Sequence, residues 1–147
     1  DQTAFSLIET LVACALVSTL ASIGAGIYIS ALETARVTRA IGDLRSMDVD
    51  IRAYQVSTSR YPATLADVRR PVPIDPWGNP YVYTDLSQRA SRGRARKDGR
   101  LNPINTDYDL YSRGRDGDTA TPLRARQSRD DIVRASNGRF VGVAAEY

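Results

Sequence analysis

Residues 5–29 read FSLIETLVACALVSTLASIGAGIYI, an apolar run whose only charged residue is Glu9. As a helix this run would extend about 38 Å, more than the roughly 30 Å of a bilayer's hydrocarbon core. We therefore predict a membrane-spanning segment. Because a carboxylate inside lipid is costly unless something neutralises it, Glu9 either lies near the interface or is kept for a partner.

The remainder of the chain has the composition of one small polar domain. The 147 residues have a formal charge of +3, and no second long apolar run follows residue 29. Histidine is absent, and the sequence contains no G-x-S-x-G, P-loop or C-x-x-C motif, so we predict that the protein is not an enzyme. The one cysteine, Cys14, lies within the apolar run, which excludes an intrachain disulfide.

A helical period continues beyond the apolar run. Apolar side chains recur three or four positions apart, as on one face of an amphipathic helix, at Val37, Ile41, Leu44, Met47, Ile51 and Tyr54. No proline occurs before residue 62, so one continuous helix of about 50 residues is expected. We accordingly divide the chain into a hydrophobic helix over residues 1–29, its amphipathic continuation over 30–57 and a globular β-rich head over 58–147.

Turns and short strand patterns alternate in the head. Five prolines between residues 62 and 80 leave room for a single helical turn at 64–69, with Thr64 as its N-cap, and residues 75–80 are typical of a turn. Strand patterns follow at 81–84, 107–112 and 139–143. We predict an α+β fold in which one long N-terminal helix packs its apolar stripe against a small antiparallel sheet, with a C-terminal loop region.

The most basic stretch is QRASRGRARKDGR, residues 88–100, with six basic residues against Asp98. It contains no apolar residue except alanine and no aromatic residue for base stacking, so we interpret it as a solvated loop. The alternative is a contact with a polyanion through the loop's central cations, Arg92, Arg94, Arg96 and Lys97.

Three stretches, in this order, resemble one family. They are FSLIETLV at 5–12, RYP at 60–62 followed by DPWGNPYVY at 75–83, and DYDLYSRGRDG at 107–117 followed by DDI at 130–132. Together they are similar to the type IV pilin superfamily, and most of all to the major pseudopilin of type II secretion systems. The resemblance covers nearly the whole chain, and DPWGNPY behind RYP is its most specific part. It implies the pilin fold, with the apolar helix as the core of a filament after assembly.

The resemblance also implies processing at Phe5. In that family a prepilin peptidase cleaves just before the Phe of the F-S/T-L-I-E motif and methylates the new amine, which meets the glutamate at the fifth mature position of a neighbouring subunit. Carried over, Phe5 is the first mature residue and Glu9 the fifth, and pairing the amine with the carboxylate would offset the burial of both charges. Ala4 stands where the family usually has glycine, and the mature chain begins at either Asp1 or Phe5.

Gly24 and Gly26 lie where members of the family often carry a proline that helps the helix to melt on assembly. Each glycine costs about 1 kcal/mol relative to alanine in a helix interior. We therefore expect a stretched or non-helical segment at residues 21–26 in the assembled filament. The alternative is that the glycines only allow close packing of helices in the membrane.

A calcium-binding loop near the C-terminus is a further implication of the resemblance. The matching stretch is residues 116–131, where hard oxygen ligands would come from the side chains of Asp116, Asp118, Ser128, Asp130 and Asp131 and from a carbonyl such as that of Leu123. The loop is not an EF-hand, because Thr121 and Gln127 replace the required glycine and glutamate. The alternative is that these aspartates cap turns and pair with the neighbouring arginines.

The function that the resemblance implies is structural. We expect a subunit that polymerises into a pilus-like filament, a pseudopilus, for protein secretion across the outer membrane. Expected partners are other copies of the chain, the inner membrane before assembly, the prepilin peptidase, the assembly platform and minor pseudopilins, whereas nucleic acid is not expected.

The positive residues after the apolar run would place the head in the cytoplasm, but the basic cytoplasmic leader of this family reverses that count. We therefore expect the head in the periplasm and then a periplasmic or extracellular filament. The alternative is a type IV pilus major pilin for adhesion, motility or, through residues 88–100, DNA uptake.

Overall fold

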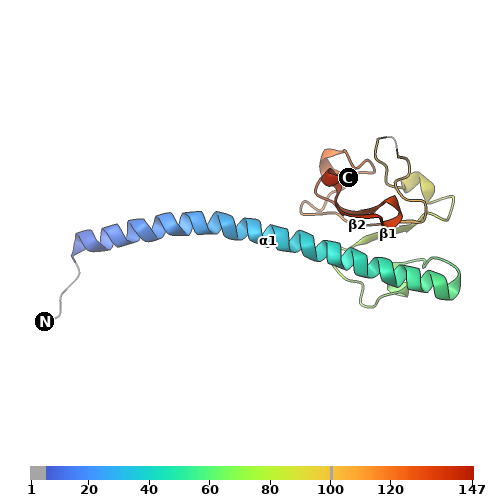
Figure 1. The fold of residues 1–147 in the computed structure, drawn as a ribbon, viewed down its shortest axis with the longest axis horizontal. Coiled ribbons are helices and arrows are strands. Elements are labelled where there is room, and N and C mark those ends of the chain that lie inside the picture. Colours follow the sequence, from blue (N-terminus) through green and yellow to red (C-terminus); the bar gives the residue numbers. More distant parts are fainter. Residues whose placement is uncertain (1–5, 100) are drawn as a thin grey trace. The chain divides into compact units, whose positions relative to one another are not determined.

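The computed structural model describes residues 6–99 and 101–147 in two compact units that divide between Ala35 and Arg36. The described residues form one long helix, α1 (Leu7–Thr58), which contributes to both units (Figure 1). The strands are β1 (Val82–Asp85), β2 (Tyr108–Ser112), β3 (Ile132–Ala135) and β4 (Phe140–Val143). Short 3₁₀ helices lie at Leu65–Asp67, Arg92–Arg94, Arg126–Ser128, Ser136–Gly138 and Ala144–Glu146.

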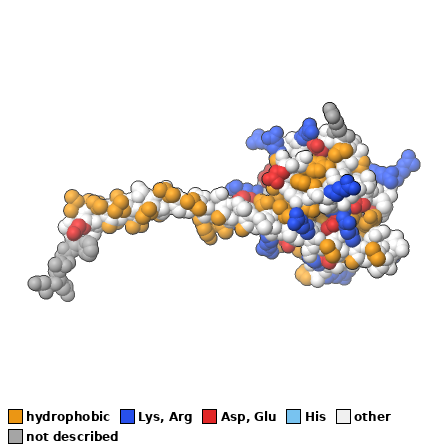
Figure 2. Space-filling view, in the orientation of Figure 1, with side chains coloured by type: hydrophobic (Ala, Val, Ile, Leu, Met, Phe, Trp, Pro, Cys, Tyr) orange, Lys and Arg blue, Asp and Glu red, His pale blue; other side chains and the backbone are white. Residues whose placement is uncertain are grey.

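In the first unit, apolar side chains of α1 are exposed. Leu7, Val12 and Ile27 are 78%, 54% and 68% exposed, and hydrophobic side chains line the helix of this unit in Figure 2. An 18-residue window of α1 has a mean hydropathy of 1.9, so α1 is long and apolar enough to cross a membrane by length and composition. The predicted apolar helix is therefore present as a helix from Leu7 onward.

The second unit contains an antiparallel sheet in the chain order β1-β2-β3-β4. One continuous row of paired residues crosses it, in which Tyr111 of β2 lies opposite Val82 and Val133, and Val133 also lies opposite Gly142. The predicted α+β class, with one long helix on a small antiparallel sheet, is confirmed.

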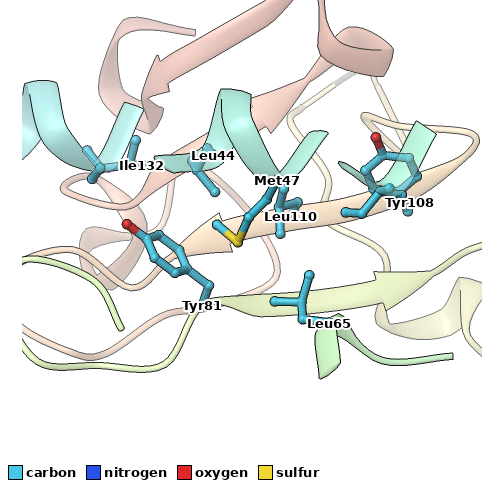
Figure 3. Packing of buried hydrophobic residues seen from close by; sticks show 9 residues of the cluster. Leu44, Met47, Leu65, Tyr81, Tyr108, Leu110 and Ile132 are labelled. Atoms are coloured by element: carbon cyan, nitrogen blue, oxygen red, sulfur yellow. The ribbon is translucent and has the colours of Figure 1, made fainter. Parts of the chain in front are cut away.

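The apolar stripe of α1 packs against this sheet. Within the second unit, Leu44, Met47 and Ile51 of α1 are fully buried. They form one cluster with side chains from the sheet and its flanking loops, including Leu65, Tyr81, Tyr108, Leu110 and Ile132 (Figure 3). From the predicted stripe, Leu44, Met47 and Ile51 belong to this core cluster and Val37 and Ile41 pack against it, whereas Tyr54 is not among its residues; Ala40 joins it.

β3 was not predicted, and the sheet has four strands where the sequence indicated three. Ile132 packs in the cluster on α1, whereas Val133 and Ala135 pack in a second cluster with Ile104, Leu123 and Ala144. β3 is thus buried on both faces, so its residues lack the alternation of apolar and polar side chains that marks a half-exposed strand. The charged residue Arg134 also interrupts its apolar run.

The two predicted turns between α1 and β1 are present. Thr64 precedes the short helix Leu65–Asp67, and its backbone amide donates to Asp67 Oδ2 at 2.8 Å, part of a capping box. In the 75–80 turn, the buried Asp75 accepts hydrogen bonds from the amides of Trp77 and Asn79. The Ser112 hydroxyl at the end of β2 donates to Asp75 at 2.6 Å, which ties this turn to the sheet.

Truncating Leu44 should test the packing of α1 on the sheet. We expect Leu44→Ala to lower the free energy of unfolding by about 2–5 kcal/mol, because it removes fully buried methyl groups and leaves a cavity. Denaturant unfolding of the full chain in detergent micelles would measure this through the fluorescence of Trp77, which packs against the same cluster. The matched control is Val49→Ala at a position 64% exposed on α1, where the change should stay within about 0.5 kcal/mol. Equal losses at both positions would contradict the packing described.

Candidate functional site

Ser6 and Glu9 form a reciprocal pair at the start of α1. The Ser6 amide donates to Glu9 Oε2 at 2.9 Å, and the Glu9 amide donates to Ser6 Oγ at 3.3 Å. This is a capping box, which satisfies two backbone amides, and the carboxylate lies at the positive end of the helix dipole. Glu9 is exposed, so its carboxylate is fixed in place at the helix start and accessible from outside. Ala4 and Phe5, the residues predicted to flank the cleavage point, lie outside the described residues.

Gly24 and Gly26 lie within the uninterrupted helix α1. A Cβ atom added at either position would meet nothing within 4 Å. Packing inside the single chain therefore does not require glycine at these positions. The segment expected at residues 21–26 of the assembled filament remains a prediction.

Three of the four cations assigned to the polyanion contact are exposed, and one is not. Arg92, Arg94 and Lys97 are exposed, whereas Arg96 is only 2% exposed. Arg96 therefore cannot contact a polyanion, which corrects the prediction at this residue. The sequence did not reveal this because the residues that contact Arg96 lie 13 to 35 positions further along the chain.

Arg96 is buried against a carboxylate and an aromatic ring. Its Nη2 donates to Asp131 Oδ2 at 2.5 Å, its Nη1 donates to Thr119 Oγ1, and its guanidinium carbon lies 4.3 Å from the centroid of the Tyr111 ring. The Arg96 amide also donates to Asp109 Oδ2 at 2.7 Å. Burial raises the pKa of Asp131, and hydrogen bonds from Thr119 and the charge of Arg96 oppose that rise.

The oxygens predicted to hold calcium are engaged by donors of the protein. Asp130 Oδ2 accepts from the amides of Arg115 and Asp116, at 2.9 and 3.1 Å, and Asp116 Oδ1 accepts from the Asp118 amide at 2.9 Å. Ser128 Oγ exchanges two hydrogen bonds with the backbone of Ala120.

The same residues do not converge on one point. Leu123 places its side chain in the second apolar cluster, and Asp131 faces Arg96. In the described part of the chain no three His, Cys, Asp or Glu residues form a group that could hold a metal ion. In this arrangement Asp116 and Asp130 accept hydrogen bonds from turn amides and Asp131 pairs with an arginine, and the calcium site stays a prediction. The arginine that pairs with Asp131 comes from the basic loop, however, and not from the neighbouring residues.

A buried charge network that the sequence analysis did not identify links α1 to β3. Arg134 of β3 is fully buried; its Nε donates to Asp48 of α1, and its Nη2 donates to Asp107 Oδ2 at 2.6 Å. The guanidinium carbon lies 4.0 Å from the centroid of the Tyr108 ring. The signal available in the sequence was Asp48, a charged residue directly after Met47 of the buried stripe.

Three proteins named type II secretion system core protein G are similar to this chain. The one from Pseudomonas aeruginosa is 29% identical over 138 residues, which cover 80% of this chain and 86% of that protein. Those from Aeromonas hydrophila and Escherichia coli K12 are 27% and 23% identical over 141 residues, which cover 82% of this chain and 87% and 86% of those proteins. No family model and no solved structure matches the chain. The resemblance to the pilin superfamily and its major pseudopilins is confirmed, and the chain is pilin-like in fold and sequence.

Removing Arg134 should destabilise the second unit strongly. We expect Arg134→Met to lower the free energy of unfolding by about 3–5 kcal/mol, because Asp48 and Asp107 would lose their shared buried cation. The control is Arg124→Met, which removes a guanidinium that is 77% exposed and pairs with Asp98 at 2.8 Å; an exposed pair of this kind contributes at most about 1 kcal/mol. Denaturant unfolding would compare the two, and a loss below about 1 kcal/mol for Arg134→Met would contradict a structural role of the network.

Proposed function

We propose that this chain is the structural subunit of a type II secretion pseudopilus. The observation that carries the proposal is an apolar helix whose side chains are exposed along residues 7–29 and whose one carboxylate is fixed at its first turn. It occurs in a chain similar over four-fifths of its length to proteins named core protein G. The likeness to structural subunits supports a role without catalysis.

The apolar part of α1 needs a non-aqueous environment. Apolar surface of this extent on a single chain marks a membrane or protein interface. A helix is suited to lipid because it satisfies its own backbone hydrogen bonds. We propose that lipid surrounds it before assembly and that other copies of the same helix surround it in the filament. The head then lies on the periplasmic side of the inner membrane, where the assembly platform and minor pseudopilins can contact it.

Glu9 is the residue that would make packing between copies specific. A neighbouring copy cleaved before Phe5 presents a positively charged amine, and an amine paired with Glu9 removes both charges from the apolar surroundings as one neutral unit. The Ser6 amide holds the carboxylate at the helix start, so the cation approaches a group that is already oriented.

Cleavage before Phe5 can be tested on the chain itself. We expect mass spectrometry of the protein from membranes that contain a prepilin peptidase to show a mature chain that begins at Phe5 and carries one added methyl group. Membranes without the peptidase serve as the control and should contain the uncleaved chain. Because Ala4 replaces the glycine usual before the cut, Ala4→Gly should speed cleavage. A chain that retains residues 1–4 in the assembled material would contradict processing at this position.

Neutralising Glu9 should abolish filaments while leaving the head folded. We expect Glu9→Gln to reduce the filamentous fraction at least about tenfold, the effect of losing roughly 1.4 kcal/mol per subunit contact, as judged by sedimentation and electron microscopy of cells that express the secretion system. The matched control is Glu146→Gln, which removes one exposed carboxylate near the end of the chain and should leave filaments intact. Thermal unfolding of the head should be the same in both variants. Abundant filaments from Glu9→Gln would argue against the proposal.

A further inference from the structure

Arg96 joins two loops and a strand through both its side chain and its backbone. The guanidinium donates to Asp131 and Thr119, while the amide donates to Asp109 of β2. The next residue continues the junction, because the Lys97 amide donates to the Thr121 carbonyl at 3.1 Å and the Lys97 carbonyl accepts from the Leu123 amide at 2.9 Å. The basic loop is therefore bound to the loop of residues 116–131 at Arg96 and Lys97.

The partners of Arg96 also bond to one another. Thr119 Oγ1 donates to Asp131 Oδ2 at 2.6 Å, so one carboxylate oxygen receives both the hydroxyl and the guanidinium. Asp131 is fully buried and Arg96 almost so. A carboxylate and a hydroxyl that converge on one buried positive charge are the ligand types of a hard cation, but the positive charge here belongs to the chain.

A calcium ion and this guanidinium compete for the same oxygen, Asp131 Oδ2. Calcium binds oxygens at about 2.3–2.6 Å, and Arg96 Nη2 already lies 2.5 Å from Oδ2. A divalent ion on this carboxylate would lie against a guanidinium that stays charged at any accessible pH. The nearby carboxylates offer no replacement cage, since among the described residues no three His, Cys, Asp or Glu side chains form a group that could hold a metal ion.

We propose that the Arg96 guanidinium takes the place of a metal ion in this protein: it is the internal cation that holds the loop of residues 88–100 to the loop of residues 116–131. The C-terminal loop region then folds without calcium. The inference goes beyond the proposed function, because it concerns the single chain and holds whether or not copies polymerise.

Removing either member of the buried Arg96–Asp131 pair should be costly. In the described structure, Arg96 Nε and Asp131 Oδ1 are buried without a hydrogen-bond partner. The Thr119 hydroxyl bonds to both side chains, but it is uncharged and cannot replace a lost counter-charge. Burial also raises the pKa of Asp131, which means that its ionised form depends on the nearby cation. Removing Arg96 would leave a buried carboxylate without a counter-charge.

The first test compares calcium with a chelator on the unmodified protein. Thermal unfolding of the full chain in detergent micelles is followed by Trp77 fluorescence, with millimolar calcium in one arm and excess chelator in the other. We expect the two Tm values to agree within about 1 °C, far below the shift of several degrees that a tightly bound ion produces. A higher Tm in calcium that is lost in Asp131→Asn would overturn the proposal.

The second test removes the cation. We expect Arg96→Met to lower the Tm by roughly 10 °C in both arms, whereas Arg92→Met, an exposed arginine of the same loop, should leave it within about 2 °C. Arg96→Lys keeps the charge without the planar fork and should fall between them. Equal Tm values for Arg96→Met and Arg92→Met would overturn the proposal. If Arg96→Met does not fold, the lysine variant and the calcium comparison on the unmodified chain still decide it.

Discussion

The burial of one stripe of α1 against the sheet is the interaction on which the second unit depends. Leu44, Met47 and Ile51 are fully buried there, and each side chain of this kind contributes about 1.5–3 kcal/mol when it leaves water. The same helix carries apolar residues all round in the first unit. This helix is therefore exposed in the first unit and packs against a protein core in the second. Its sequence pattern changes accordingly from continuously apolar to amphipathic.

Charges that lie inside the second unit are arranged on both faces of the sheet. On the face toward α1, Arg134 is shared between Asp48 and Asp107. On the other face, Arg96 meets Asp131 and the ring of Tyr111. Each guanidinium stacks on an aromatic ring and bonds to a carboxylate, so fixed groups of the chain balance both buried charges. Arginine is suited to this because its planar fork matches the carboxylate, and no other side chain offers the same geometry.

Most of the fold could be predicted from local signals. The period of α1, the Thr64 cap and the 75–80 turn depend on residues close together in sequence, and all are present. β3 could not be predicted, because burial on both faces removes the alternation that identifies a strand.

In the candidate site, too, residues with partners close in sequence could be predicted and residues with distant partners could not. Glu9 was identified because a charged residue is unusual in an apolar run. Its hydrogen-bond partner Ser6 lies only three residues away. The burial of Arg96 was not predicted, because a basic loop is normally solvated. Arg96 pairs with Asp131, which lies 35 positions further along the chain. Pairing across such a distance depends on the tertiary structure and leaves no pattern in the sequence.

The capping box at the start of α1 gives Glu9 a hydrogen-bond donor in its own chain. The amide uses one of the roughly four acceptor sites of the carboxylate, so a cation from outside can bind without displacing it. The hydrogen bond orients the carboxylate but leaves it negatively charged, and in lipid only a cation neutralises it. The charge is therefore held at a set position before any cation arrives, and pairing requires little further ordering of the Glu9 side chain.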